Sequence, residues 1–323
     1  MTSPRFLMFA LRRGIGALGL VATAAFAQPS GGPYGPVPQR YAVPKAPHVY
    51  YVAPDGKADA AGTTLAEPTS IEAAIARVVT GDAIVLRGGI YRTGNLKLNQ
   101  GITIQPYLDE TPVLKGTRVA TEWQALPRNV WRTKWSTLFP ARPLGWWQSN
   151  HEGAVTPLHR FNNDMVFIDG QPLQSAGWAG EMGTTGYYID YDKGYVYIGT
   201  NPSGRTVEIT AHDVALHRPS REVNGKPSDK KGFTLRGVTL TQYAYRAIDI
   251  EGKKPSTLVS EEPTDDPVGP SPEAEHGKEV VGTLLERNIV RRNNVERLTG
   301  YFPAAVKIFN QSHRVVVRDN VIV

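Results

Sequence analysis

The chain has 323 residues, of which 41% are hydrophobic and 20% charged, and this composition excludes a wholly disordered protein. Its formal net charge is +6, but the basic residues are not concentrated in the stripe that a nucleic-acid-binding surface needs. We therefore expect no nucleic-acid partner. Cysteine is absent, which excludes disulfide bonds, thiolate metal sites and a lipid-modified N-terminal cysteine.

Residues 1–27 have the pattern of a secretory signal peptide. Three arginines without any acid precede an apolar, small-residue run over residues 14–26, which ends in the cleavage pattern Ala25-Phe26-Ala27. The run is shorter than the roughly 20 apolar residues that span a bilayer, so we expect no transmembrane segment after cleavage. The sequence therefore predicts a secreted or periplasmic protein, whose net charge falls to +3 when the three arginines are removed.

Residues 28–48 are rich in proline and glycine, which is typical of an extended linker. The folded part is expected to begin at Val49, with a first unit over residues 49–116. Within it, Thr69-Ser70 precedes apolar residues spaced by three and four from Ile71 to Val78, which predicts one short capped helix. Brief strands bounded by Gly, Pro or Asn follow, and this pattern favours a capped solenoid.

Two stretches of this first unit resemble the N-terminal segment of pectate-lyase-like β-helix proteins. They are Tyr51-Val52-Ala53-Pro54-Asp55-Gly56 and Gly81-Asp82-Ala83-Ile84-Val85-Leu86-Arg87-Gly88-Gly89-Ile90-Tyr91, with the predicted helix between them. The resemblance implies an all-β fold, a right-handed parallel β-helix with an N-terminal capping helix. It implies nothing about catalysis, because in that family this segment only caps the solenoid.

Residues 117–231 form the second unit, which we expect to be a β-rich insertion beside the solenoid. Its first part contains all six tryptophans, and residues 187–190 and 195–198 alternate like the two strands of a hairpin. Indole rings stack on sugar faces but also fill protein cores. Trp146 and Trp147 are adjacent, so one ring of the pair is expected at the surface, where it would bind substrate.

The solenoid resumes over residues 232–323, interrupted by an acidic, Pro-rich loop at 252–279. Segments 235–240, 285–290 and 317–322 superpose around Gly237, Asn288 and Asn320, residue types that tolerate a left-handed bend. The sequence stops within the last of these repeats, without a polar cap. We therefore expect a fold truncated at the C-terminus, with catalytic coils missing from the chain.

Asp249 and Glu251 are the strongest local indication of a catalytic site in the sequence. They alternate with Ile248 and Ile250, so both acids point to one face, about 7 Å apart along the strand. The family resemblance implies two reactions, and one of them, glycoside hydrolysis, uses such a pair of carboxylates. The same pattern fits an ordinary exposed strand face, in which case replacing Asp249 would leave thermal stability nearly unchanged.

The second reaction that the resemblance implies is elimination from a uronate polymer, which requires a base and positive charge near the substrate carboxylate. Arg246, Lys307 and His313 are expected at coil edges and supply these groups. Calcium is the possible cofactor of such a lyase, bound by the acid pair together with Glu286. Lys307 alternates with the core residues Val306 and Ile308, a pattern that is more often that of a solvated flank residue.

Trp146, Trp147, His313 and Asn310 complete the candidate substrate-binding residues, although Asn310 also fits a structural turn. The sequence thus favours a secreted polysaccharide-active β-helix protein, either a lyase or a glycoside hydrolase. Two alternatives stay open: a non-catalytic glycan-binding or cell-surface β-helix protein, and an inactive fragment of a longer enzyme. No pattern in the sequence defines a metal site or an oligomeric state.

Overall fold

The computed structural model describes residues 39–140, 157, 159, 162–250, 280–293, 305–308 and 312–322. The chain divides into two units, Met1–Tyr34 and Gly35–Val323, and all described residues belong to the second. The predicted signal peptide and the first part of the predicted linker lie outside the described residues. Within them, no helix is long and apolar enough to cross a lipid bilayer.

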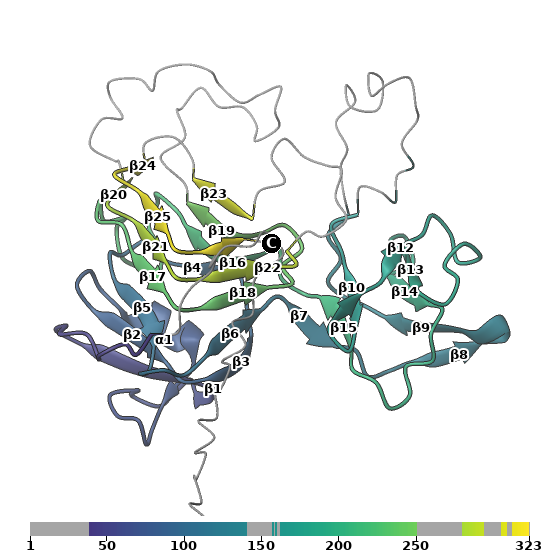
Figure 1. Ribbon diagram of the computed structural model, residues 1–323, viewed down its shortest axis with the longest axis horizontal. Helices are drawn as coiled ribbons and strands as arrows, with labels where there is room; N and C mark the ends of the chain where they lie inside the picture. Colours follow the sequence, from purple (N-terminus) through teal and green to yellow (C-terminus); the bar gives the residue numbers. More distant parts are fainter. Residues whose placement is uncertain are drawn as a thin grey trace, which may run out of the picture. The chain divides into compact units, whose positions relative to one another are not determined.

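Three parallel sheets form the walls of a β-helix, which confirms the predicted fold class (Figure 1). The first wall consists of β1 (Val49–Lys57), β2 (Ala83–Leu86), β5 (Thr103–Pro106), β17 (Thr234–Arg236), β21 (Leu284–Glu286) and β25 (Val316–Arg318). The second wall consists of β3 (Gly89–Arg92), β6 (Pro112–Lys115), β18 (Thr239–Thr241), β22 (Ile289–Arg291) and β26 (Val321–Ile322). The third wall consists of β4 (Leu96–Lys97), β16 (Val214–Arg218), β19 (Arg246–Ile250) and β23 (Val306–Ile308).

Successive coils contribute strands to the walls in the same order, so residues far apart in sequence stack in register. Leu235 pairs with Leu285 and Leu285 with Val317, as the superposed repeats predict. A small additional sheet pairs β20 (Val280–Val281) with β24 (Ser312–His313). The apolar residues between the walls form one continuous core, to which every coil from β1 to β22 contributes.

Helix α1 (Ile71–Arg77) covers the start of this core, where the sequence predicts a capping helix. Ser70 is its N-cap, and the Ser70 hydroxyl accepts a hydrogen bond from the Ala73 N–H at 3.2 Å. Ile71, Ala74 and Ile75 are buried against the strands of the first coil. The spacing of the apolar residues therefore placed one face of the helix correctly.

Residues 39–48, which the composition assigns to the linker, are held against the first wall. The Tyr41 N–H donates to the Leu108 carbonyl at 2.9 Å, and the Gln105 amide donates to the Ala42 carbonyl at 2.8 Å. The guanidinium of Arg236 lies 5.4 Å from the centre of the Tyr41 ring. The folded part of the chain thus begins before Val49. Its backbone does not join the parallel ladder, but the Leu108 carbonyl and the Gln105 side chain form hydrogen bonds with it.

Asparagine side chains, rather than left-handed asparagine backbones, fix the bend between the first and second walls. The residues with positive φ at this bend are Gly237, Arg287 and Asp319, at 68°, 52° and 56°. Asn288 follows Arg287, and Asn320 follows Asp319. The side chain of each asparagine bonds to the coil before it, and the Asn288 side-chain amide donates to the Leu235 carbonyl at 2.9 Å. This corrects the prediction that Asn288 and Asn320 take the left-handed conformation, since their side chains are needed for bonds between coils.

Asn320 repeats the contact one coil later and completes a ladder. Its amide donates to the Leu285 carbonyl at 2.8 Å, and its carbonyl oxygen accepts from the Asn288 N–H at 2.8 Å. In the coil before, the Asn288 side chain accepts from the Val238 N–H at 3.1 Å. Buried backbone groups at the bend therefore find partners in the neighbouring coil.

The insertion leaves the solenoid after β6 and forms two sheets of its own. One sheet has the order β11 (Gln171–Pro172), β10 (Val166–Ile168), β15 (Val207–Thr210) and β7 (Thr117–Val119). The other has the order β12 (Gln174–Ser175), β13 (Gly186–Asp190), β14 (Tyr195–Ile198), β9 (Val130–Lys134) and β8 (Gln124–Leu126), with the 3-10 turn η1 (Pro127–Asn129) between β8 and β9. Their facing sides enclose a separate core, against which Trp123, Trp131 and Trp135 pack.

Both ends of the insertion meet at one residue, Gly116. The Gly116 carbonyl accepts from the Ala211 N–H at 2.8 Å and from the His212 N–H at 3.0 Å. A Cβ atom at this position would lie 2.6 Å from the Gln242 carbonyl oxygen, so only glycine fits. The chain then re-enters the third wall at β16, well before the predicted boundary at residue 231, because Ala215 and Leu216 belong to the solenoid core.

A buried ion pair joins the insertion to the second wall. Glu208 of β15 is 1% exposed, and its two carboxylate oxygens each lie 2.6 Å from a cation, Arg92 Nη1 and Lys115 Nζ.

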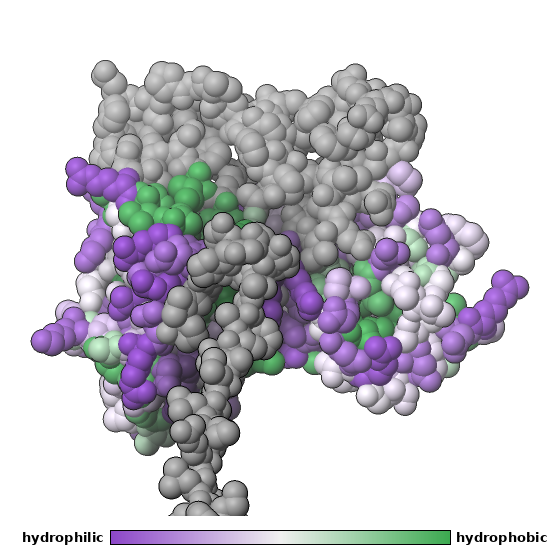
Figure 2. Space-filling view, viewed as in Figure 1, coloured by the Kyte–Doolittle hydropathy of each residue, from purple (hydrophilic) through white to green (hydrophobic). Residues whose placement is uncertain are grey.

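At the far coils, Val316, Val317 and Ile322 are about half exposed, and Figure 2 shows an apolar patch over this part of the solenoid.

Candidate functional site

Three chemically active residues, Lys97, His217 and Asp249, stack in one row on the outer side of the third wall, and the backbone of Lys307 continues their register. Lys97 pairs in register with His217, His217 with Asp249, and Asp249 with Lys307. Alternation produces the row, because the preceding residues Leu96, Leu216 and Ile248 are buried in the core. Neighbouring strands lie about 4.8 Å apart, so successive side chains of the row are within reach of one another.

The row lies in a groove with a volume of about 370 Å³. The groove is lined by Asn95, Lys97, Asp213, Val214, His217, Tyr245 and Asp249. It thus combines an ammonium group, an imidazole, a phenol and two carboxylates on a surface built from three successive coils. These are the residue types that bind charged ligands and transfer protons.

Arg246 holds Asp249 in place. The residue is 3% exposed, its Nη1 donates to Asp249 Oδ2 at 2.9 Å, and its guanidinium lies 4.0 Å from the centre of the Tyr245 ring. Asp249 is therefore the counter-ion of a buried cation, so from the structure we expect its loss to lower thermal stability, in contrast to the expectation from the sequence. Arg246 is positioned to orient Asp249 and Tyr245 rather than to contact a ligand.

The structure brings together only some of the residues proposed from the sequence. Arg246, Asp249 and the backbone of Lys307 belong to the third wall, whereas His313 lies in β24, paired with Val281. Four further candidates lie outside the described residues: Glu251, Asn310, Trp146 and Trp147.

Of the three oxygen ligands proposed for calcium, Asp249 and Glu286 lie on different walls, and Glu251 lies outside the described residues. Glu286 belongs to the first wall and is bound there by Arg287 and by Arg318, whose Nη2 lies 2.7 Å from Glu286 Oε1. Asp249 is on the third wall and is paired with Arg246. In the described part of the chain, no group of three or more His, Asp or Glu side chains could hold a metal ion. These residues therefore do not fit a calcium site.

Lys97, Asp213, His217 and Tyr245 were missed by the sequence analysis. A signal for His217 was present, because Val214-Ala215-Leu216-His217-Arg218 has the same alternation as Arg246-Ala247-Ile248-Asp249-Ile250. The first of these segments falls within the predicted insertion, residues 117–231, so the sequence does not place it on the solenoid. Their pairing in the structure, Leu216 with Ile248 and His217 with Asp249, follows that alternation.

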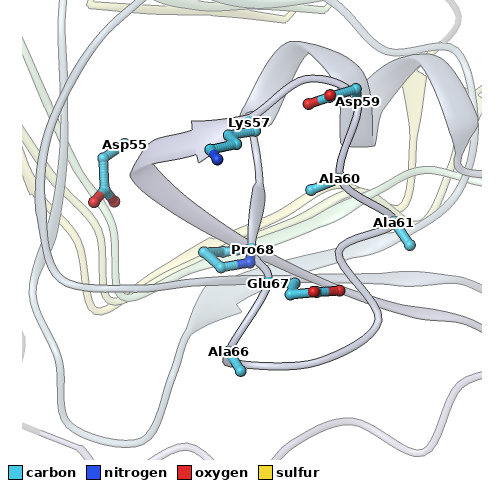
Figure 3. A pocket seen from close by; sticks show the side chains of 8 residues that line it. All are labelled: Asp55, Lys57, Asp59, Ala60, Ala61, Ala66, Glu67 and Pro68. Carbon is cyan, nitrogen blue, oxygen red and sulfur yellow. The ribbon is translucent and has the colours of Figure 1, made fainter.

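A larger hollow of about 490 Å³ lies at the end of β1 and on the loop between β1 and α1. It is lined by Asp55, Lys57, Asp59, Ala60, Ala61, Ala66, Glu67 and Pro68. Figure 3 shows that the carboxylates of Asp55, Asp59 and Glu67 lie apart around it and do not point to one position. This hollow therefore lacks the convergent polar groups of a binding site.

The insertion contains one strongly perturbed carboxyl group, Asp164. Burial raises its pKa to about 6, although it accepts hydrogen bonds from the Phe139 N–H at 2.7 Å and from the Thr210 hydroxyl at 2.8 Å. The Tyr191 hydroxyl is a third donor, at 3.2 Å. The carboxyl group has no exposed surface, so its role is structural rather than catalytic.

This perturbed pKa predicts a pH-dependent stability. Because the folded-state pKa of Asp164 lies above the unfolded value of 3.8, its contribution is fully present below about pH 4 and is lost as the pH rises through 6. We expect the free energy of unfolding to fall by about 3 kcal/mol over this window relative to Asp164→Asn. Chemical denaturation from pH 4 to 7 measures it, with exposed Asp192→Asn as the control; parallel pH profiles for wild type and Asp164→Asn would contradict it.

No protein-family profile matches the sequence, and no curated protein sequence matches it. The complex structure of XylC with xylose has a TM-score of 0.41 and 17% identity, covering 62% of this chain and 41% of that chain. A glycoside hydrolase has a TM-score of 0.37 and 12% identity, covering 61% and 51%.

The structure of pectate lyase Pel9A has a TM-score of 0.31 and 12% identity, covering 77% of this chain and 34% of that chain. The chain thus spans about half or less of the length of each of these proteins. Likenesses at these identities and TM-scores do not show a function for this chain.

Proposed function

We propose that this chain is a secreted protein that binds an acidic polysaccharide in the groove of the third wall and cleaves it by β-elimination. The observation that supports this proposal is the register of His217 between Lys97 and Asp249 within one groove. An imidazole beside an ammonium group combines a proton acceptor with a counter-ion for a substrate carboxylate. Export from the cytoplasm is part of the proposal and rests on the leader pattern of residues 1–27.

Each group has a defined role in the proposed reaction. The Lys97 ammonium pairs with the uronate carboxylate and makes the neighbouring C5 proton more acidic. His217 takes that proton, a C4–C5 double bond forms, and the C4–oxygen bond breaks. The departing oxygen takes a proton from the Tyr245 hydroxyl, so that atoms and charge balance within the groove.

The spacing of the carboxylates disfavours hydrolysis in this groove. Asp213 lies beside Tyr245, whose N–H donates to the Asp213 carbonyl at 2.8 Å, four residues before Asp249. That offset is about 13 Å along a strand, which exceeds the roughly 5–10 Å between the two carboxylates of a glycoside hydrolase. Asp249 is also committed to its ion pair with Arg246.

Replacing His217 tests the proposal. We expect the purified chain to release unsaturated products from polygalacturonate or alginate, and His217→Ala to lower turnover by about 100-fold or more while substrate affinity changes little. Ultraviolet absorbance follows the unsaturated products, and a reducing-end assay follows hydrolysis. His159→Ala, in the insertion, is the matched control and should retain full turnover.

Three results would contradict the proposal. Reducing ends without unsaturated products would show hydrolysis, and full turnover by His217→Ala would remove the imidazole from the reaction. Glycan affinity without products from any polymer would identify a non-catalytic glycan-binding protein, the alternative function that the sequence leaves open.

A further inference from the structure

The five-stranded sheet of the insertion has one buried and one exposed face. On the buried face, Tyr187, Ile189, Val196 and Ile198 are at most 4% exposed and form part of the insertion core. The alternate residues of the same strands point the other way, as the period of two requires. The exposed face is therefore not needed to close the core.

Three tyrosines gather on this exposed face. Tyr188 pairs in register with Tyr197, and their ring centres are 5.6 Å apart. The Tyr195 ring centre lies 6.2 Å from that of Tyr197, on the same strand. All three are only partly exposed, so the rings lie on the sheet and form an aromatic surface instead of projecting singly into solvent.

Two cations border the tyrosines. Arg132 pairs in register with Tyr197, and Lys134 with Tyr195; the charged group of each lies 4.6 Å from the centre of the Tyr195 ring. Two acids lie near these cations: Asp190, which is paired with Lys193 at 3.3 Å, and Asp192, which acts on Tyr188, so three cations face two acids. The tyrosine platform, defined as Tyr188, Tyr195, Tyr197, Arg132 and Lys134, therefore carries a local excess of positive charge.

We propose that the tyrosine platform binds a strand of acidic polysaccharide, as a second glycan site separate from the groove. The apolar face of a pyranose ring stacks on an aromatic ring, and a chain of sugars fits a row of rings better than a single ring. Arg132 and Lys134 meet the carboxylates that such a chain carries. The class of glycan rests on the proposed function, whereas the existence of the site rests on the platform alone.

Binding of polygalacturonate to the full chain tests this site. We expect the double variant Tyr195→Ala/Tyr197→Ala to bind polygalacturonate about tenfold more weakly in affinity electrophoresis or calorimetry. Arg132→Gln/Lys134→Gln keeps the rings and should weaken binding to polygalacturonate without weakening any binding to neutral xylan. This second variant keeps the test decisive if loss of two tyrosines harms folding.

Two controls separate this site from the groove and from exposed aromatic residues in general. Trp178, at 65% exposure, lies in the insertion outside the platform, so Trp178→Ala should bind normally. His217→Ala should retain platform binding even when turnover is lost, which separates this proposal from the proposed reaction. Unchanged affinity in both platform variants, or an equal loss in Trp178→Ala, would overturn the proposal.

Discussion

Replacing Ile248 with aspartate is expected to prevent the solenoid from folding, with a loss in the free energy of unfolding above about 4 kcal/mol. Ile248 is 1% exposed and stacks between Leu216 of the coil before and Val306 of the coil after. A carboxylate there would lie in an apolar stack without a cation. Circular dichroism and thermal melting of the purified variant measure the effect.

Both isoleucines, Ile248 and Ile250, are buried, as the alternation predicts. Replacing Ile250 with aspartate is nevertheless a poorer test of the core. The register partner of Ile250 is Arg218, which is itself fully buried, and burial lowers the Arg218 pKa to about 10. An aspartate at position 250 would gain this arginine as a partner. Ile248→Val is the control, with an expected cost of about 0.5–1.5 kcal/mol. A cooperative melt at the wild-type temperature for Ile248→Asp would show that this stack is not a dry core.

Loss of Glu208 is the second large effect that we expect. Glu208→Ala leaves Arg92 and Lys115 without their shared carboxylate between the insertion and the second wall. Removing one partner of a fully buried ion network typically costs 3–5 kcal/mol, but Arg92 and Lys115 are 31% and 13% exposed, so we expect a loss of about 2–3 kcal/mol in the free energy of unfolding. Denaturant titration measures this loss.

An exposed ion pair provides the control for Glu208. Arg40 and Asp109 are separated by 3.3 Å, but their side chains are 65% and 69% exposed. Asp109→Ala should therefore change the free energy of unfolding by no more than about 1 kcal/mol. Equal effects of Glu208→Ala and Asp109→Ala would mean that burial does not strengthen the contribution of Glu208.

The sequence predicted the solenoid well because its signals are local. The spacing of apolar residues located α1, and the three superposed repeats have the register seen between β17, β21 and β25. The repeats also predicted the position of the bend between the first and second walls. They did not predict the hydrogen bond of the Asn288 side chain, because its acceptor, the Leu235 carbonyl, lies one coil away. Such a contact has no signature within its own segment.

The candidate site was less predictable because its residues meet only after the coils stack. Lys97 and His217 are register neighbours, yet the whole insertion lies between them in the sequence. The alternation around Asp249 predicted the burial of its neighbours correctly but gave no sign of the ion pair with Arg246, which lies three residues earlier on the same strand. Strand periodicity assigns residues to a face and does not identify their partners.

The closure at Gly116 has a consequence for how this protein is assembled from parts. Because the chain departs and returns through one glycine, the insertion occupies a single bend of a single coil and does not interrupt the stacking of the walls. Exchange of the module at this bend would require a new partner for Arg92 and Lys115, whose charges are neutralised by Glu208 of the insertion. Given such a partner, the coils before and after would keep their register, so the groove and the module are able to diversify independently.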